Sequence, residues 1–300
     1  MEHEDSYEPF QSDLAVYHDD YGDYSTNEPT MDGTASLIYL LAAKASESTK
    51  DIKYSGADPS YQSKSKTLVK SHGAIVQSDT SRKEVALVFT ADEFGEGLPT
   101  IIKTLNKNSV YASFFFTGRF YRIPLFQNEI DQLAKSSNYL GPHSDQHLLY
   151  CDWNKRDSTL ISRARFQFDF NQNVAAMSKY RWPTSNSPYF IPPYEWWNDD
   201  IVRWCNEKGI TLFNFTPGIG TNADYTWPEM GNAYKSSEVL ISNLKKFEAT
   251  NPNHLNGAII LIHAGTDPRR KDKLYDHLDE LIVYLKEKGY QIKEIPMLLK

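Results

Sequence analysis

The stretch VALVFTADEFGEGLPTIIKTLNKNSVYASFFFTG, residues 85–118, decides the fold. Its first five residues are aliphatic, β-branched or aromatic, and they predict a buried strand over 85–89. A loop with two glycines follows, and Pro99 then stands in the first turn of a helix predicted to end at Asn108. YASFFF (111–116) predicts the next strand. A strand, a helix and a strand in this order are typical of a βα unit in a parallel sheet.

The same alternation continues toward the C-terminus. Further strands are predicted for NYLGPH (138–143), SPYFIP (187–192), TLFNF (211–215) and AIILIH (258–263). Helical patterns cover residues 126–136, 158–179, 198–208, 235–250 and 273–288. Six or seven βα units around one sheet favour an α/β barrel. A doubly wound open sheet is the alternative, and the pattern of runs does not separate the two.

Residues 1–72 lack this alternation and are predicted to form a mostly irregular extension, so the α/β domain is expected at 73–300. Residues 1–33 are rich in Asp, Glu, Tyr, Ser and Gly, a composition that predicts a disordered or loosely attached tail. The apolar run 37–45 predicts a short helix near 36–46, capped by Ser36. The polar segment 51–67 contains Gly56 and Pro59 and predicts a linker.

The composition excludes several classes of protein. A net charge of −7 argues against a nucleic-acid partner, which needs a basic face. The longest apolar run, near 37–43, is far shorter than the roughly 20 residues that cross a bilayer. The first ten residues lack the basic and apolar regions of a signal peptide. We therefore expect an extracellular or periplasmic location if a leader has been removed and a cytoplasmic location otherwise, while the oligomeric state stays open.

Titratable side chains follow four of the predicted strands. Asp92 comes after 85–89, His143 ends 138–143, Glu195 follows 187–192, and His263 ends 258–263. In both candidate architectures, reactive groups gather where the strands end and the loops begin. We therefore expect these four side chains to share one site.

GPHSDQH (141–147) carries two histidines at positions i and i+4, a spacing at which one helical turn lets both bind one cation. A capped helix start with two partly exposed histidines, His143 and His147, is the alternative. Such a site needs a third ligand, commonly a carboxylate, and Asp92 is the first candidate. Glu93 and Glu96 are weaker ones, and the alternative for all three is an acidic, solvated loop.

His263 ends the most apolar strand of the chain and is predicted to be a general acid whose pKa a nearby carboxylate, Asp267 or Asp224, sets. A buried structural histidine is the alternative.

PPYEWWNDD (192–200) predicts a rigid loop that presents an acid and three aromatic rings. Tyr194 and Glu195 are expected in the catalytic site. Trp196, Trp197 and Asp224 are expected to contact the substrate, although at least one of the two tryptophans is expected to belong to the core.

The order of these motifs resembles the polysaccharide deacetylase family, also called the NodB homology or carbohydrate esterase 4 family, over roughly residues 73–295. Residues 85–118 look like the family's first strand, loop, helix and second strand, and GPHSDQH is similar to its His-Ser/Thr-x-x-x-His metal motif. YFIPPYEWW (189–197) occupies the place of the Arg-x-Pro-Tyr segment, and AIILIH is similar to the closing strand. The resemblance implies a distorted (β/α) barrel, similar to a TIM barrel.

The resemblance also implies a hydrolase that removes N- or O-acetyl groups from a carbohydrate. A divalent metal on Asp92, His143 and His147 would activate water, with zinc expected first and cobalt, nickel or manganese as alternatives. The Tyr194 backbone N–H would be an oxyanion donor, and His263 would protonate the leaving group.

The sequence departs from the family at its first strand. Thr90 and Ala91 stand where the family has two consecutive aspartates, and Ile191 replaces the arginine that braces the first of them. Asp92 comes one position later than the second of these aspartates, and the glycine-rich loop permits a local bulge that would bring it back to the metal. Glu195 or Glu93 is the expected replacement base. Two alternatives follow, a catalytically inactive carbohydrate-binding protein and a metal-dependent barrel amidase that acts on a non-sugar substrate.

Overall fold

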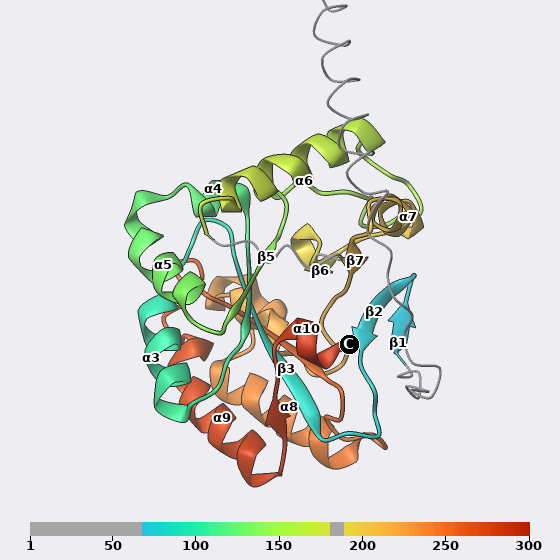
Figure 1. The fold of residues 1–300 in the computed structure, drawn as a ribbon. Helices are drawn as coiled ribbons and strands as arrows, with labels where there is room; N and C mark the ends of the chain where they lie inside the picture. The colour runs from blue at the N-terminus through green and yellow to red at the C-terminus, as the bar shows by residue number, and fades with distance from the viewer. Residues whose placement is uncertain (1–67, 181–188) are drawn as a thin grey trace, which may run out of the picture. The chain divides into compact units, whose positions relative to one another are not determined.

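Strand β3 (Glu84–Ala91) lies at the middle of the main sheet (Figure 1). The computed structural model describes residues 68–180 and 189–300, so the predicted helix near 36–46 and the predicted linker lie outside the described residues. Parallel partners flank β3 on both sides, β4 (Ser113–Phe116) and β8 (Ile259–His263). β5 (Tyr139–Pro142) pairs with β4, and β9 (Gln291–Ile292) pairs with the start of β3. The predicted α/β class with a parallel sheet is confirmed.

The sheet curls toward a distorted barrel through shorter elements. β6 (Tyr189–Phe190) and β7 (Thr211–Leu212) form a parallel pair, and β1 (Val69–Ser71) and β2 (Ala74–Gln77) form a hairpin. Single bridges join the hairpin to its neighbours, one between residues 75 and 213 and one between residues 77 and 258. Side chains join β5 to β6, because the Tyr139 hydroxyl accepts a hydrogen bond from the Tyr189 N–H (3.3 Å).

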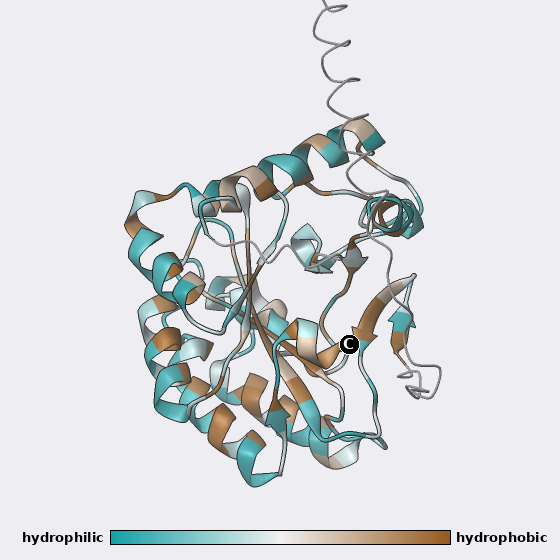
Figure 2. Ribbon diagram, viewed as in Figure 1, coloured by the Kyte–Doolittle hydropathy of each residue, from teal (hydrophilic) through white to brown (hydrophobic). Residues whose placement is uncertain are grey.

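Alternation along the strands determines which residues reach the site. Ala86 and Val88 of β3 pack inside the curled sheet together with Ile259 and Leu261 of β8. Leu87 and Phe89 face the other way, with most of the core beneath the outer helices. Figure 2 shows the same strands as the most apolar part of the fold. The next positions on the inner face are Thr90 and His263, which are direct neighbours in the β3–β8 register at the C-terminal ends of both strands.

Helices cover the outside of this sheet (Figure 1). They are α3 (Leu98–Asn108), α4 (Gly118–Tyr121), α5 (Gln127–Lys135), α6 (Arg163–Met177), α7 (Asp199–Glu207), α8 (Ser237–Thr250) and α9 (Leu278–Glu287). The C-terminal α10 (Ile295–Leu298) packs Ile295 and Leu298 into the inner cluster of the sheet. Among residues 68–180 and 189–300, no helix is both long and apolar enough to span a lipid bilayer.

Two features differ from the predictions. The strands predicted at 187–192 and 211–215 end early, because residues 191–192 and 213–215 run on outside β6 and β7 toward the site. The β1–β2 hairpin was not predicted, and the expected domain start at residue 73 lies in its turn. There His72 and Gly73 both have positive φ. The exposed, polar β1 gives no alternating apolar signal, which explains why the hairpin was missed.

Candidate active site

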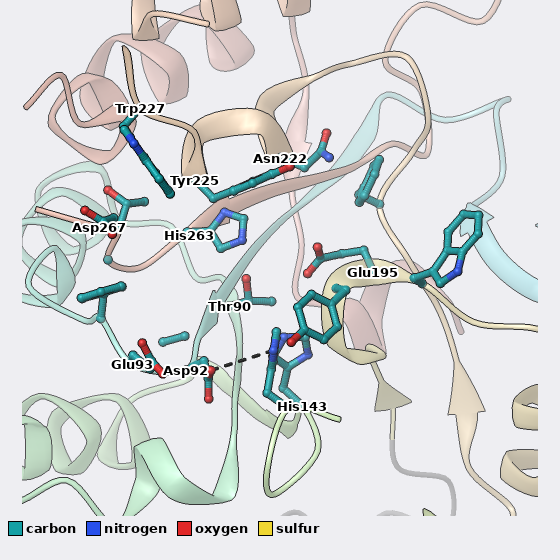
Figure 3. Close-up of a pocket in the computed structure, with 18 of the residues that line it drawn as sticks. Thr90, Asp92, Glu93, His143, Glu195, Asn222, Tyr225, Trp227, His263 and Asp267 are labelled. Atoms are coloured by element: carbon teal, nitrogen blue, oxygen red, sulfur yellow. Dashed lines mark ion pairs between the residues drawn. The ribbon is translucent and has the colours of Figure 1, made fainter. Parts of the chain in front are cut away.

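A cavity of about 620 Å³ opens at the C-terminal ends of the strands (Figure 3). Its walls include all four strand-end residues expected there, Asp92, His143, Glu195 and His263. They come from segments far apart in the sequence, after β3, β5, β6 and β8. The common site inferred from their positions is therefore present in the fold.

His263 is held by a buried carboxylate. Its ring Nδ1 lies 2.5 Å from Asp224 Oδ1, and its backbone N–H donates to Asp224 Oδ2 (2.9 Å). Burial lowers the pKa of His263, but the charge of Asp224 and its hydrogen bond outweigh burial, so the pKa is raised above its ordinary value. Since a carboxylate only accepts, Nδ1 carries the proton and Nε2 is left for the cavity.

Asp224 itself is only 1% exposed, and both of its carboxylate oxygens contact His263. It is therefore a positioning residue, and its predicted contact with substrate is wrong. The alternative partner, Asp267, pairs with Arg269 (2.6 Å) at the cavity edge.

Glu195 points into the cavity toward His263 and Thr90 (Figure 3). It lies in the 3₁₀ helix Pro193–Glu195, where Tyr194 (φ 57°) and Glu195 (φ 51°) both have left-handed backbone. This conformation is strained for residues with a side chain, and such strain persists where the surroundings enforce it. Burial raises the pKa of Glu195 to about 7. The carboxyl group therefore changes charge near neutral pH.

The rings of His143 and His147 lie close together, but the segment that carries them is not the helical turn that was predicted. Their ring centroids are 5.0 Å apart, yet the segment is a loop in which Ser144 (φ 73°) and His147 (φ 53°) have left-handed backbone. Asp169 of α6 holds this loop by accepting from the Ser144 hydroxyl (2.6 Å) and from the backbone N–H groups of residues 145 and 146 (both 3.0 Å). A buried carboxylate takes up the loop's donors, so a helix does not form.

Both histidine rings are neutral near pH 7. Burial is the main cause that lowers the pKa of His143 to about 3 and that of His147 to about 4. His143 Nδ1 lies 2.9 Å from the Ile191 carbonyl, which can only accept. The ring therefore donates through Nδ1 and keeps the Nε2 lone pair for another partner, as metal-bound histidines do.

Asp92 lines the cavity without the local bulge that the sequence allowed. β3 keeps an unbroken register with both neighbours up to Ala91, and Asp92, two positions after Thr90, continues the inner face. Its carboxylate is paired with Arg119 through two hydrogen bonds, one of them from Nε at 2.5 Å. Burial raises the pKa of Asp92, but the hydrogen bonds from Arg119 and Thr117 and the charge of Arg119 lower it below its ordinary value, so the group is ionised near neutral pH.

These residues fit a divalent cation in part. The neutral histidines have the right chemistry for zinc and related metals, and Asp92 Oδ2 lies 3.9 Å from His147 Nδ1. Arg119, however, occupies the carboxylate that the metal would need. Within the described part of the chain, no three His, Cys, Asp or Glu side chains stand in a metal-binding arrangement. A cation held by all three residues requires Asp92 to exchange its arginine partner.

The two weaker candidates for the metal-binding carboxylate, Glu93 and Glu96, are placed differently from Asp92. Glu93 lines the cavity but is 63% exposed and lies 3.5 Å from Arg119. Glu96 accepts from the Thr266 N–H (3.0 Å) and from Lys273 Nζ (2.8 Å), so it ties two loops together and does not face the cavity. Thr90, which is 1% exposed, lines the cavity, and its hydroxyl has no hydrogen-bond partner among the described residues.

Aromatic rings form much of the remaining wall. Trp196 lines the cavity, whereas Trp197 is 3% exposed and packs in the core, so Trp197 is the tryptophan that was expected to belong to the core. Sequence reasoning missed Trp153, Tyr225 and Trp227, which also line the cavity. Tyr225 could have been predicted, because it follows the candidate residue Asp224 directly in the sequence. No sequence pattern points to Trp153 or Arg119, because only the folded chain brings them to the site.

Comparison with known proteins shows what this chain is similar to. Residues 77–213 match the family model described as polysaccharide deacetylase. An uncharacterized 30.6 kDa protein of Geobacillus stearothermophilus is 25% identical over 228 residues, covering 76% of this chain and 75% of that protein.

Two solved structures share the fold. One is a carbohydrate esterase family 4 pseudoenzyme from Bacillus anthracis, with 20% identity, TM-score 0.59 and coverage of 77% of this chain and 70% of that one. The other is PdaA from Bacillus subtilis, a family 4 carbohydrate esterase, with 21% identity, TM-score 0.58 and coverage of 76% and 85%. The chain is therefore similar to the polysaccharide deacetylase family over residues 77–213, and it shares the fold of these two structures.

Proposed function

We propose that this protein hydrolyses acetyl groups from a carbohydrate, with His263 as general acid and Glu195 as general base. The observation that carries the proposal is the convergence of the His263–Asp224 pair and the Glu195 carboxyl group in one aromatic-walled cavity. Two titratable groups whose surroundings raise both pKa values supply an acid and a base near neutral pH.

In the proposed reaction, the ionised Glu195 carboxylate takes a proton from a water molecule. The water oxygen forms a bond to the acetyl carbon, and the carbonyl oxygen becomes negatively charged. The backbone N–H of Tyr194 is the proposed donor to that oxygen. When the intermediate collapses, the bond from the acetyl carbon to nitrogen or oxygen breaks. His263 gives its Nε2 proton to the departing amine or alcohol, and acetate is the second product.

His143, His147 and Asp92 would hold the divalent metal, with zinc proposed first and cobalt, nickel or manganese as alternatives. When bound, the metal supplies a Lewis acid for the carbonyl and lowers the pKa of water. The residues themselves prepare this site through the Nδ1 contact of His143 with Ile191 and the neutral state of both rings.

Acetate release from acetylated chitooligosaccharides, peptidoglycan fragments and acetylated xylan tests the proposal, with zinc, cobalt, nickel and manganese each supplied in turn. We expect release from at least one sugar, and loss of release in Glu195→Gln and His263→Ala. A parallel panel of non-sugar acyl amides addresses the amidase alternative. Release from those amides alone would contradict a carbohydrate substrate.

A second candidate function is carbohydrate binding without catalysis. The pairing of Asp92 with Arg119 and the presence of Thr90 and Ala91 on β3 favour it, because the site then lacks a free metal-binding carboxylate. The similar Bacillus anthracis protein is itself described as a pseudoenzyme. Calorimetric binding of acetylated oligosaccharides without acetate release under any of the four metals would support this function over hydrolysis.

A further inference from the structure

Arg270 is a fully buried arginine in the loop after β8, and the proposed reaction does not use it. Its side chain is 0% exposed. Asp272, at 3.8 Å, is its one ion-pair partner among the described residues, and its Nε has no hydrogen-bond partner among them. A buried charge is costly unless close partners compensate it. Ion pairing is therefore a weak reason for an arginine at this position, and its hydrogen bonds suggest another one.

The guanidinium of Arg270 holds both ends of a loop. Its Nη1 donates to the backbone carbonyls of Thr226 (2.7 Å) and Lys235 (3.0 Å). Its Nη2 donates to the Ser237 hydroxyl (3.2 Å). These three acceptors lie before and after the 3₁₀ helix Pro228–Ala233. One rigid, planar group therefore fixes where this loop leaves and rejoins the fold.

The same loop begins beside the partner of the proposed acid. Asp224 comes two positions before Thr226, and both of its oxygens contact His263. Arg270 comes seven positions after His263. The chain that leaves β8 therefore contacts the segment 224–226 twice, first through His263 and then through Arg270. Two contacts between the same two segments restrict their relative position more than either contact alone.

The neighbouring Arg269 contacts this segment from the solvent side. Its guanidinium lies 3.8 Å from the ring centroid of Trp227, which lines the cavity near His263 (Figure 3). Arg269 is 58% exposed, so water competes with its contacts. The hydrogen bonds of the buried Arg270 are protected from that competition and are stronger for it. We therefore assign the positioning of the segment to Arg270.

We propose that Arg270 is a positioning residue that keeps Asp224 in contact with His263. It acts through the hydrogen bonds that hold the loop and does not touch the reacting groups. This inference rests on the proposed function for the role of His263 as general acid, whereas the contact between Asp224 and His263 can be measured without turnover. Lysine is a poor substitute for Arg270, because its single, compact ammonium group cannot reach all three acceptors.

Proton NMR of the full chain tests the contact directly. The proton between His263 Nδ1 and Asp224 lies in a short, charge-assisted hydrogen bond (2.5 Å) and should resonate far downfield. Loss of this signal in His263→Ala assigns it. We expect Arg270→Met to move the signal upfield or to abolish it through exchange with water. Arg270→Lys, which keeps the charge and part of the hydrogen bonding, should move it less.

Steady-state kinetics on the best acetylated substrate give a second measurement. Arg270→Met should lower kcat about tenfold with KM unchanged, the same loss that we expect for Asp224→Asn. Because Arg270 acts through Asp224, the double variant should lose no more than Asp224→Asn alone. Glu248→Gln is the matched control: Glu248 is also buried, pairs with Lys288 (3.3 Å) and does not line the cavity. Thermal melting checks that each variant is folded.

The outcomes separate this inference from the proposed function. An unchanged downfield signal in folded Arg270→Met, or in Arg270→Lys if the methionine variant does not fold, overturns the inference. Additive losses of kcat in the double variant overturn it as well, since Arg270 would then act independently of Asp224. A displaced signal in a protein whose wild type releases no acetate supports the inference and contradicts hydrolysis. Acetate release by the wild type, with the same signal in every Arg270 variant, supports hydrolysis and contradicts the inference.

Discussion

The two halves of the cavity differ in how completely they are assembled. On one side, His263 and Asp224 form a fully paired unit, with Glu195 directed toward it. On the other side, His143 and His147 are close to each other, but the Asp92 carboxylate is paired with Arg119. The first side, which contains the proposed acid, is fully paired as it stands, whereas the histidine side has an arginine where a metal would compete.

The difference follows from the charges that each side must balance. Asp224 is almost fully buried, and a histidine with a raised pKa compensates it. Asp92 is only partly buried, and the two neutral histidines offer it no positive charge. Arg119 supplies that charge from the adjacent α4. The carboxylate at position 92 therefore has a cationic partner from the chain itself.

The largest expected effect is on the acid side. His263→Ala removes the proposed proton donor, and we expect acetate release to fall about 10³-fold, within the range for general acid catalysis. Steady-state kinetics on the best substrate of the panel measure the change. His277→Ala is the control, because this histidine lies outside the cavity. Unchanged kcat in His263→Ala would remove the acid side from the mechanism.

Glu195→Gln should lower kcat about 10²-fold and change the pH profile. A base works when deprotonated, so wild-type activity should rise with pH through about 7, the raised pKa of this group. The glutamine variant should lose that acidic limb. The pH dependence of kcat between pH 5 and 9, in about half-unit steps, measures it. A limb that persists in the variant would assign the base to another residue, with Glu93 the next candidate.

Asp224→Asn should have a smaller effect, about tenfold at the pH optimum, together with a shift of the alkaline limb. An acid works when protonated, so wild-type activity should fall as pH rises through the raised pKa of His263. Asparagine keeps the shape of the side chain but removes the charge that raises this pKa. The alkaline limb should therefore move to lower pH. A limb that stays in place would show that Asp224 does not set the protonation of His263.

The smallest effect is expected on the histidine side. Arg119→Gln frees Asp92, and we expect zinc affinity, measured by calorimetry, to rise about tenfold, equal to about 1.4 kcal/mol. Arg122→Gln is the matched control at the C-cap of the same helix, because Arg122 pairs with Asp145 (2.7 Å) and not with Asp92. Equal zinc affinity in wild type and Arg119→Gln would mean that the arginine does not compete with the metal.

The sequence by itself determined the parallel α/β class, the order of the motifs and the strand-end positions of Asp92, His143, Glu195 and His263. These features depend on local periodicity: alternation places successive inner-face residues at the same end of a sheet. Periodicity also explains why the expected common site is present.

Only the tertiary structure decided how those residues are used. Asp169 of α6 holds the two-histidine segment as a loop. Asp224 pairs with His263 behind the cavity wall, and Trp197 packs into the core. Arg119 and Trp153 join the site from segments that carry no motif. Each of these outcomes depends on a long-range partner that satisfies a buried charge, a backbone donor or an apolar ring. Such partners leave no periodic signal in the chain.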